Sequence, residues 1–304
     1  MKFLKVLALI LLGFLLFLSL SIFGVALMLN LTIFNSNFIV SELDELNISS
    51  LAKDLFHQQL ILNESYMTEA VDNTITELEP WIKEQIHTSI YSGYGYLLGK
   101  RQSLNLEIPL APLKDSLKNN LREAILQSPP PELTGAPSTA IELYINEAQQ
   151  AVDEMIPPRF ELNESSLSPE VLSQLTEVKQ AIGYVQLTYK VLIALILLLI
   201  LGIVLLKREV RGTTRELGII FTTYGAFEYL GLIIIKRLAG AQLPQLGIPL
   251  PLQDWLPQFL RGVLLPLEIF SLSLLIAGVA LIVVSFVYKP RQPSEVEAIH
   301  TFTT

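Results

Sequence analysis

The sequence predicts an all-α membrane protein with four transmembrane helices and a large extracytoplasmic helical bundle domain inserted between the first two. Hydrophobic residues make up 51% of the chain and charged residues only 16%, which is too apolar for an ordinary soluble domain. Four segments also reach the roughly 20 apolar residues that cross a bilayer. A long polar segment with helical periodicity separates the first two of them.

The predicted domains follow the apolar segments and the charges between them. An N-terminal cytoplasmic tip and the first span take up residues 1–30, and the outer domain takes up 31–186. The other parts are spans at 187–206, 217–235 and 263–288, a basic cytoplasmic loop at 207–216, a proline-rich apolar outer loop at 236–262 and a cytoplasmic tail at 289–304.

The first apolar run is predicted to be a retained signal anchor. Lys2 and Lys5 precede it, as basic residues precede the apolar part of a secretory signal peptide. The run is about twice as long as the usual apolar part of 7–15 residues. No A-x-A cleavage site follows it, so we expect the segment to remain as a transmembrane helix.

Basic residues near the span ends predict the orientation in the membrane. The predicted inner side carries more of them than the short outer loop, and basic residues near span ends face the cytoplasm. We therefore expect both termini inside a cell membrane and residues 31–186 outside. The inner set is Lys2, Lys5, Lys207, Arg208, Arg211, Arg215, Lys289 and Arg291, and the outer set is Lys236, Arg237 and Arg261.

The segment 31–186 is acidic. It holds 22 Asp and Glu against 9 Lys and Arg, a net charge of −13, whereas the rest of the chain sums to +5, which together give the −8 of the whole chain. An acidic surface disfavours nucleic acid and anionic lipid headgroups as partners. The lipid bilayer and a protein or envelope component remain as expected partners, although acidity also serves solubility alone.

Apolar residues recur at every third or fourth position in five stretches of the segment 31–186, which is the period of a helix that buries one face. The stretches begin at Met67, Ile82, Leu113, Ile141 and Leu175. The last one continues into the second span without a helix breaker, which predicts one long helix from Ser168. Residues 103–108 alternate between polar and apolar instead. Because a single strand has no partner, we expect an extended connector there.

The sequence lacks the patterns of metal, phosphate and nucleophile sites. His57, His87 and His300 share no helical face, and the chain has no cysteine. The glycine-rich residues 91–100 resemble a phosphate-binding loop, but Tyr94 stands in place of its first glycine and Arg101 in place of its hydroxyl. We therefore expect no cofactor, no bound metal and no enzymatic activity.

Two glutamates interrupt the apolar spans. Glu228 lies eight residues before Lys236, so ~12 Å below the outer end of the third span. Glu268 lies seven residues after Arg261, so ~10 Å below the outer end of the fourth. Glycines and serines share their helix faces, which predicts that spans three and four pack closely and turn both acids inward.

These acids form a candidate intramembrane polar site together with Tyr224, Ser271 and Lys190, which lies near the outer start of the second span. Three states are open: an ion pair with Lys190, a proton shared between the two carboxyls, or a bound cation. A fourth interpretation is purely structural, with polar side chains joining the spans.

A short run resembles a known family. Residues 215–226 read R-E-L-G-I-I-F-T-T-Y-G-A and resemble the R-E-I-G-I-L…G-A segment of FtsX/MacB-type permeases. Those proteins have a span, a large outer domain and three further spans. This chain departs from the pattern by one extra residue before Gly-Ala, and its outer domain is predicted to be helical where MacB-type domains contain sheets. The resemblance implies a permease subunit.

Two functions follow from these patterns. The first is an interaction or sensing module, in which the segment 31–186 binds a protein or envelope component and the four spans anchor it. The alternative is a transporter or permease subunit that uses Glu228, Glu268 and Lys190 as a proton or cation site. The apolar loop at 236–262, with Trp255, is expected to cap the membrane interface or to re-enter the bilayer.

Overall fold

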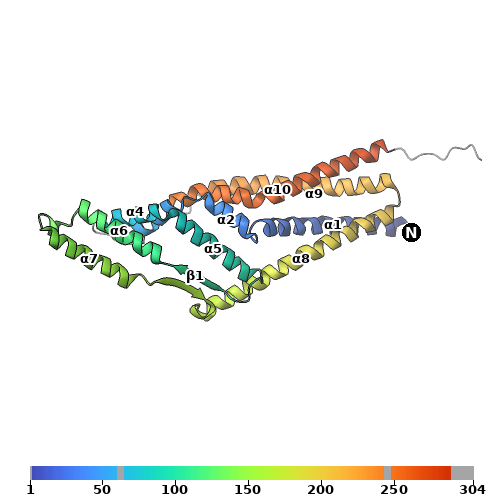
Figure 1. The fold of residues 1–304 in the computed structure, drawn as a ribbon. Coiled ribbons are helices and arrows are strands. Elements are labelled where there is room, and N and C mark those ends of the chain that lie inside the picture. Colours follow the sequence, from blue (N-terminus) through green and yellow to red (C-terminus); the bar gives the residue numbers. More distant parts are fainter. Residues whose placement is uncertain (1, 60–64, 243–247, 289–304) are drawn as a thin grey trace, which may run out of the picture. The chain divides into compact units, whose positions relative to one another are not determined.

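The computed structural model describes residues 2–59, 65–242 and 248–288, which are nearly all helical (Figure 1). Four helices in the described ranges are long and apolar enough to cross a membrane. Each contains one predicted span, so the prediction of a multi-pass helical protein is supported by length and composition. They are α1 (Lys2–Leu31), α8 (Pro169–Lys207), α9 (Val210–Gln242) and α10 (Leu250–Val287).

The chain separates into two compact units. The first, here called the apolar unit, consists of residues 2–27, 188–234 and 266–288 of the described chain. Its helices carry apolar side chains on every face, and most of these are exposed, as expected for surfaces that meet lipid. A smaller set is buried between the helices: Leu9, Leu16, Leu20, Leu199, Ile203, Leu217 and Tyr224.

The second unit, here called the polar unit, consists of residues 28–187 and 235–265. All five predicted helical stretches are confirmed, and α8 runs unbroken through the last of them. Two further helices, α2 and α3, were not predicted. The α-helices that lie wholly within this unit are α2 (Ser36–Asp44), α3 (Ile48–Gln59), α4 (Ser65–Glu77), α5 (Glu79–Leu97), α6 (Ala111–Gln127) and α7 (Ser138–Met155).

The core of the polar unit lies where α4 packs on α6 and α6 packs on α7. Ala70, Ile125 and Ile145 are almost completely buried there, together with Tyr66, Leu121, Ala124 and Val152. At its edge, Arg122 of α6 forms a two-pronged ion pair with Glu142 of α7, with N···O distances of 2.9 and 2.6 Å. The apolar helix faces that the sequence predicts therefore pack together in one layer.

The prediction of an unpaired connector at residues 103–108 was wrong. Residues Asn105–Pro109 form strand β1, which pairs antiparallel with β2 (Arg159–Asn163). Leu106 faces Leu162, and Arg159 donates to Glu107 at 2.6 Å. The partner strand was missed because it lies about 50 residues further along the chain and is only five residues long, too short for its alternation to stand out.

Two predicted loops are shorter than expected. Only Arg208 and Glu209 separate α8 from α9, and Arg208 takes a left-handed φ of 56°. The predicted outer loop is helical up to Gln242 and again from Leu250, while residues 243–247 and the predicted tail at 289–304 lie outside the described residues. Pro251 stands in the first turn of α10, where no hydrogen-bonding N–H is needed.

Candidate functional site

Tyr224 is buried at the centre of the apolar unit. Its ring meets Phe17 and Phe270 edge to face, at centroid distances of 5.8 and 6.0 Å, and only 1% of its surface is exposed. The hydroxyl is buried as well and forms no hydrogen bond with the described residues. A buried hydroxyl without a partner is uncommon in folded proteins.

The predicted close packing of spans three and four is confirmed within the apolar unit. A Cβ on Gly225 of α9 would lie 2.5 Å from the backbone oxygen of Ser271 in α10. A Cβ on Gly278 would lie 2.5 Å from the backbone nitrogen of Thr222. The two backbones therefore touch at glycines, as in other tightly packed membrane helices.

The other predicted site residues surround this contact. Ser271 is completely buried, and its hydroxyl donates to the backbone oxygen of Glu268 at 3.0 Å. Glu228 and Glu268 are both half-buried, whereas Lys190 is exposed on α8. The ion pairs of the described residues do not include Lys190. Whether the two carboxyls share a proton or a cation stays a prediction.

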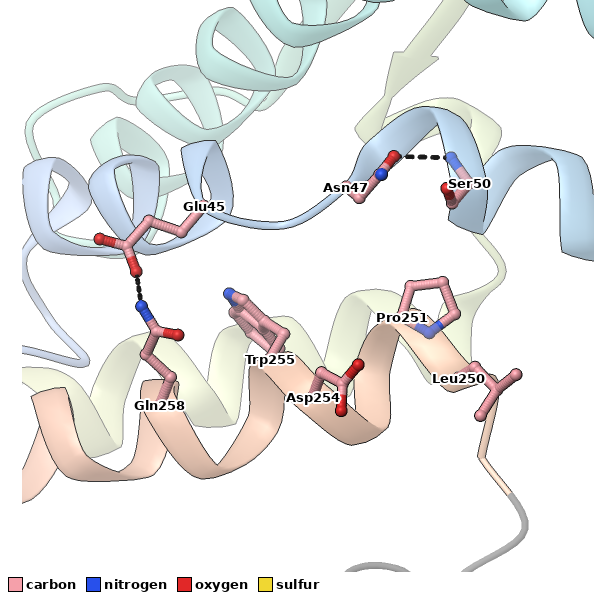
Figure 2. Close-up of a pocket in the computed structure, with 8 residues that line it drawn as sticks. All are labelled: Glu45, Asn47, Ser50, Leu250, Pro251, Asp254, Trp255 and Gln258. Atoms are coloured by element: carbon pink, nitrogen blue, oxygen red, sulfur yellow. Dashed lines mark hydrogen bonds between the residues drawn. The ribbon is translucent and has the colours of Figure 1, made fainter.

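A polar cleft of about 350 Å³ lies in the polar unit between the α2–α3 turn and the first turns of α10 (Figure 2). Gln258 of α10 donates to Glu45, and Trp255 donates through its indole nitrogen to the backbone oxygen of Glu42 at 2.7 Å. Trp255 also stacks on Phe259 at 4.8 Å. These contacts pack the first turns of α10 on α2 within the polar unit.

Glu42 lies next to this cleft. One of its carboxylate oxygens would be 2.5 Å from a Cβ on Gly262, so the glycine makes room for it. The other oxygen is buried and accepts no hydrogen bond from the described residues. Burial raises the pKa of the Glu42 carboxyl above its usual value, and the nearby charge of Glu45 raises it further.

A second hollow in the polar unit is apolar. It has a volume of about 440 Å³, within the range of about 300–1,000 Å³ typical of small-molecule sites. Its walls come from α3, α4, α5 and α6 together with Leu110 and Ile156. The walls include Phe56, Val71, Ile75, Trp81, Leu113 and Leu117. We call this hollow the apolar cavity.

A hydrogen-bond network holds α4 against α6 beside the apolar cavity. Ser116 and Asn120 of α6 donate to the Glu77 carboxylate at 2.5 and 2.9 Å. These hydrogen bonds hold the pKa of the Glu77 carboxyl below its usual value. Asn120 also donates to Thr74, whose hydroxyl donates in turn to the backbone oxygen of Ala70 at 2.7 Å. The polar groups at this wall are therefore satisfied from within the protein.

Neither hollow resembles a metal centre. Within residues 2–59, 65–242 and 248–288, no group of three or more His, Cys, Asp or Glu side chains is arranged to hold an ion.

Comparisons with protein-family models, with curated proteins and with solved structures found no match to this chain. The geometry of its own residues therefore carries the functional argument.

The sequence predicts that several residues lining the apolar cavity lie on buried helix faces, but it does not predict the cavity. Ile75, Leu78 and Ile82 belong to two predicted helical stripes, and Leu113 and Leu117 to a third. Periodicity gives the face of a helix that avoids water, but it does not say whether opposing faces meet.

Proposed function

We propose that this protein is a membrane-anchored binding module, in which the segment 31–186 takes up an envelope component and the four apolar helices hold it at the bilayer. The observation that carries the proposal is the apolar cavity. Protein interiors are close-packed and leave few voids larger than a water molecule, so an open apolar hollow of this size needs an explanation. Binding is the commonest one.

The acidic surface of the segment 31–186 is compatible with this role. Its ion pairs are formed among its own residues, as between Lys118 and Asp153 or Lys83 and Glu79. Such exposed pairs contribute little to stability, ~0–1 kcal/mol each. The charged side chains keep the surface soluble. The apolar cavity is therefore the feature of this segment that is expected to bind a ligand.

The proposal is tested by site-specific photo-crosslinking in membranes. A benzoylphenylalanine replaces Phe56, which lines the apolar cavity and is 43% exposed. The matched control carries the same residue in place of Leu143, which lies on α7 away from the cavity and is 62% exposed. We expect a defined adduct at position 56 that position 143 does not give. Identical adducts at both positions, or none at either, would refute the proposal.

A second candidate function rests on the unpartnered hydroxyl of Tyr224. This group lies one helical turn from Glu228, and a polar group buried in a membrane helix bundle is a candidate for proton or ion passage. In this alternative the protein is a transporter or permease subunit, and the pair Glu228 and Glu268 binds the transported proton or cation.

Transport assays in proteoliposomes decide the alternative. A proton or cation flux that the double variant Glu228→Gln/Glu268→Gln abolishes would support it, and the variant Glu209→Gln serves as the control because that exposed residue lies between α8 and α9. The absence of flux in the unaltered protein would remove the alternative and leave the binding module unaffected.

A further inference from the structure

The apolar cavity is built to receive a ligand without polar groups. The described residues of its lining include no charged side chain, and Thr74 supplies the one hydroxyl among them. That hydroxyl is already engaged with Ala70 and Asn120. The indole N–H of Trp81 is the lining's single side-chain donor without a hydrogen bond among the described residues. A ligand with several polar groups would lose its contacts with water here and gain few in return.

Several basic side chains that lie next to the lining in sequence are already paired with acids of this chain. His57 pairs with Asp72 at 3.1 Å, Lys83 with Glu79 at 2.9 Å, and Lys114 with Asp153 at 3.4 Å. The two lysines are each paired with an acid of this chain, whereas Lys53, next to Ala52, forms no ion pair among the described residues. We therefore expect the apolar body of the ligand to supply most of the recognition, with any polar head left in water.

An acyl chain fits these requirements. We propose that the apolar cavity binds one long acyl chain of a lipid or fatty acid, which names the ligand class of the binding module and rests on that proposed function. Four helices of this chain are long and apolar enough to cross a bilayer, so acyl chains are the apolar molecules always within its surroundings. Each methylene that moves from water into the cavity contributes favourable transfer free energy.

The inference is tested with the full chain in lipid nanodiscs and a photoactivatable palmitate. After illumination and digestion, we expect adducts on peptides that contain Val71, Ile75, Leu113 or Leu117, in addition to adducts on the membrane helices. The adducts on the membrane helices serve as an internal control, because they show that the probe has reached the protein. Unlabelled palmitate is expected to compete for the first group, whereas acetate is not.

The variant Ala52→Phe fills the cavity from α3, because Ala52 lines it. We expect this variant to lose about tenfold or more of the adduct yield at the cavity, since a phenyl ring occupies the space that the chain would need. Val71→Phe fills the same space from α4 and provides a second test if Ala52→Phe fails to fold. The control Ala181→Phe adds the same ring at an exposed position of α8 outside the lining and is expected to keep the full yield.

The outcomes separate the ligand sources and the two proposals. Cavity adducts from a photoactivatable phosphatidylcholine indicate a membrane lipid, and adducts from palmitate alone indicate a free fatty acid. Both outcomes support the inference. Adducts confined to the membrane helices, or cavity adducts that survive both filling variants, overturn it. A protein adduct at position 56 in the benzoylphenylalanine experiment would overturn the acyl chain while keeping the binding module.

Discussion

Glu42 illustrates how a single carboxyl in the polar unit depends on its surroundings. It is half-buried against Gly262, and the pKa of its carboxyl is raised by burial and by Glu45. A carboxyl whose folded pKa lies above its unfolded value stabilises the fold fully only below the unfolded pKa. That contribution is lost as the pH rises through the folded pKa, so the charged form of Glu42 is less favourable in the folded protein than the neutral form.

The variant Glu42→Gln is therefore expected to raise the midpoint of thermal unfolding by a few degrees at pH 7–8 and to have no such effect near pH 4. The measurement is thermal unfolding of the full chain in nanodiscs followed by tryptophan fluorescence, since Trp255 bonds to the backbone of Glu42. Glu147→Gln, at an exposed position of α7, controls for the loss of a negative charge. A lower midpoint for Glu42→Gln at neutral pH would contradict this account.

At the scale of elements, the contact between α9 and α10 within the apolar unit is set by glycine. Gly225 and Gly231 both lie on α9, but only the first is in contact with α10: a Cβ at 225 would lie 2.5 Å from backbone, whereas a Cβ at 231 would meet nothing within 4 Å. Backbone atoms cannot move aside as a flexible side chain can. The same substitution should therefore have opposite consequences at the two positions.

We expect Gly225→Ala to destabilise the protein by about 1–3 kcal/mol, the usual cost of overpacking a close contact. Gly231→Ala should be neutral or slightly stabilising, because alanine favours the helix more than glycine does. Thermal stability in a fixed detergent provides the comparison. Equal losses in the two variants would mean that the helices do not approach each other at Gly225.

At the scale of the whole molecule, the orientation in the membrane remains a prediction from the distribution of basic residues. The chain has no cysteine, so single cysteines can be introduced without removing any native one. Leu143→Cys lies in the segment 31–186 and Arg211→Cys near the start of α9, and both positions are exposed.

A membrane-impermeant maleimide should label Leu143→Cys in intact cells and Arg211→Cys only after the membrane is permeabilised. The expectation follows from the excess of basic residues between the second and third spans, which favours the cytoplasmic side. The reverse labelling pattern would show that the topology is opposite to the predicted one. It would also move the apolar cavity to the cytoplasmic side.

Much of the helical structure could be predicted from local sequence because the relevant signals are local. The spans are long apolar runs, and the stripe from Leu113 to Ile125 keeps its period over the whole of α6. The pairing of β1 with β2 was missed because it joins segments about 50 residues apart, one of them short. The helical start of α10 was missed because a proline-rich stretch is typical of a loop, whereas Pro251 occupies a first-turn position that a helix tolerates.

For the candidate sites, too, some features follow from the sequence and others only from the tertiary structure. The sequence by itself determined four apolar helices and the glycines that let α9 and α10 touch, since these depend on composition and local spacing. The depth of Glu228 and Glu268 stays a prediction from a fixed rise per residue. Only the tertiary structure decided that Tyr224 has an unpartnered buried hydroxyl and that Lys190 is exposed. It also decided that the apolar faces of α3, α4, α5 and α6 leave a cavity, because whether packed surfaces fill the space between them depends on side-chain volumes and helix positions that no periodicity encodes.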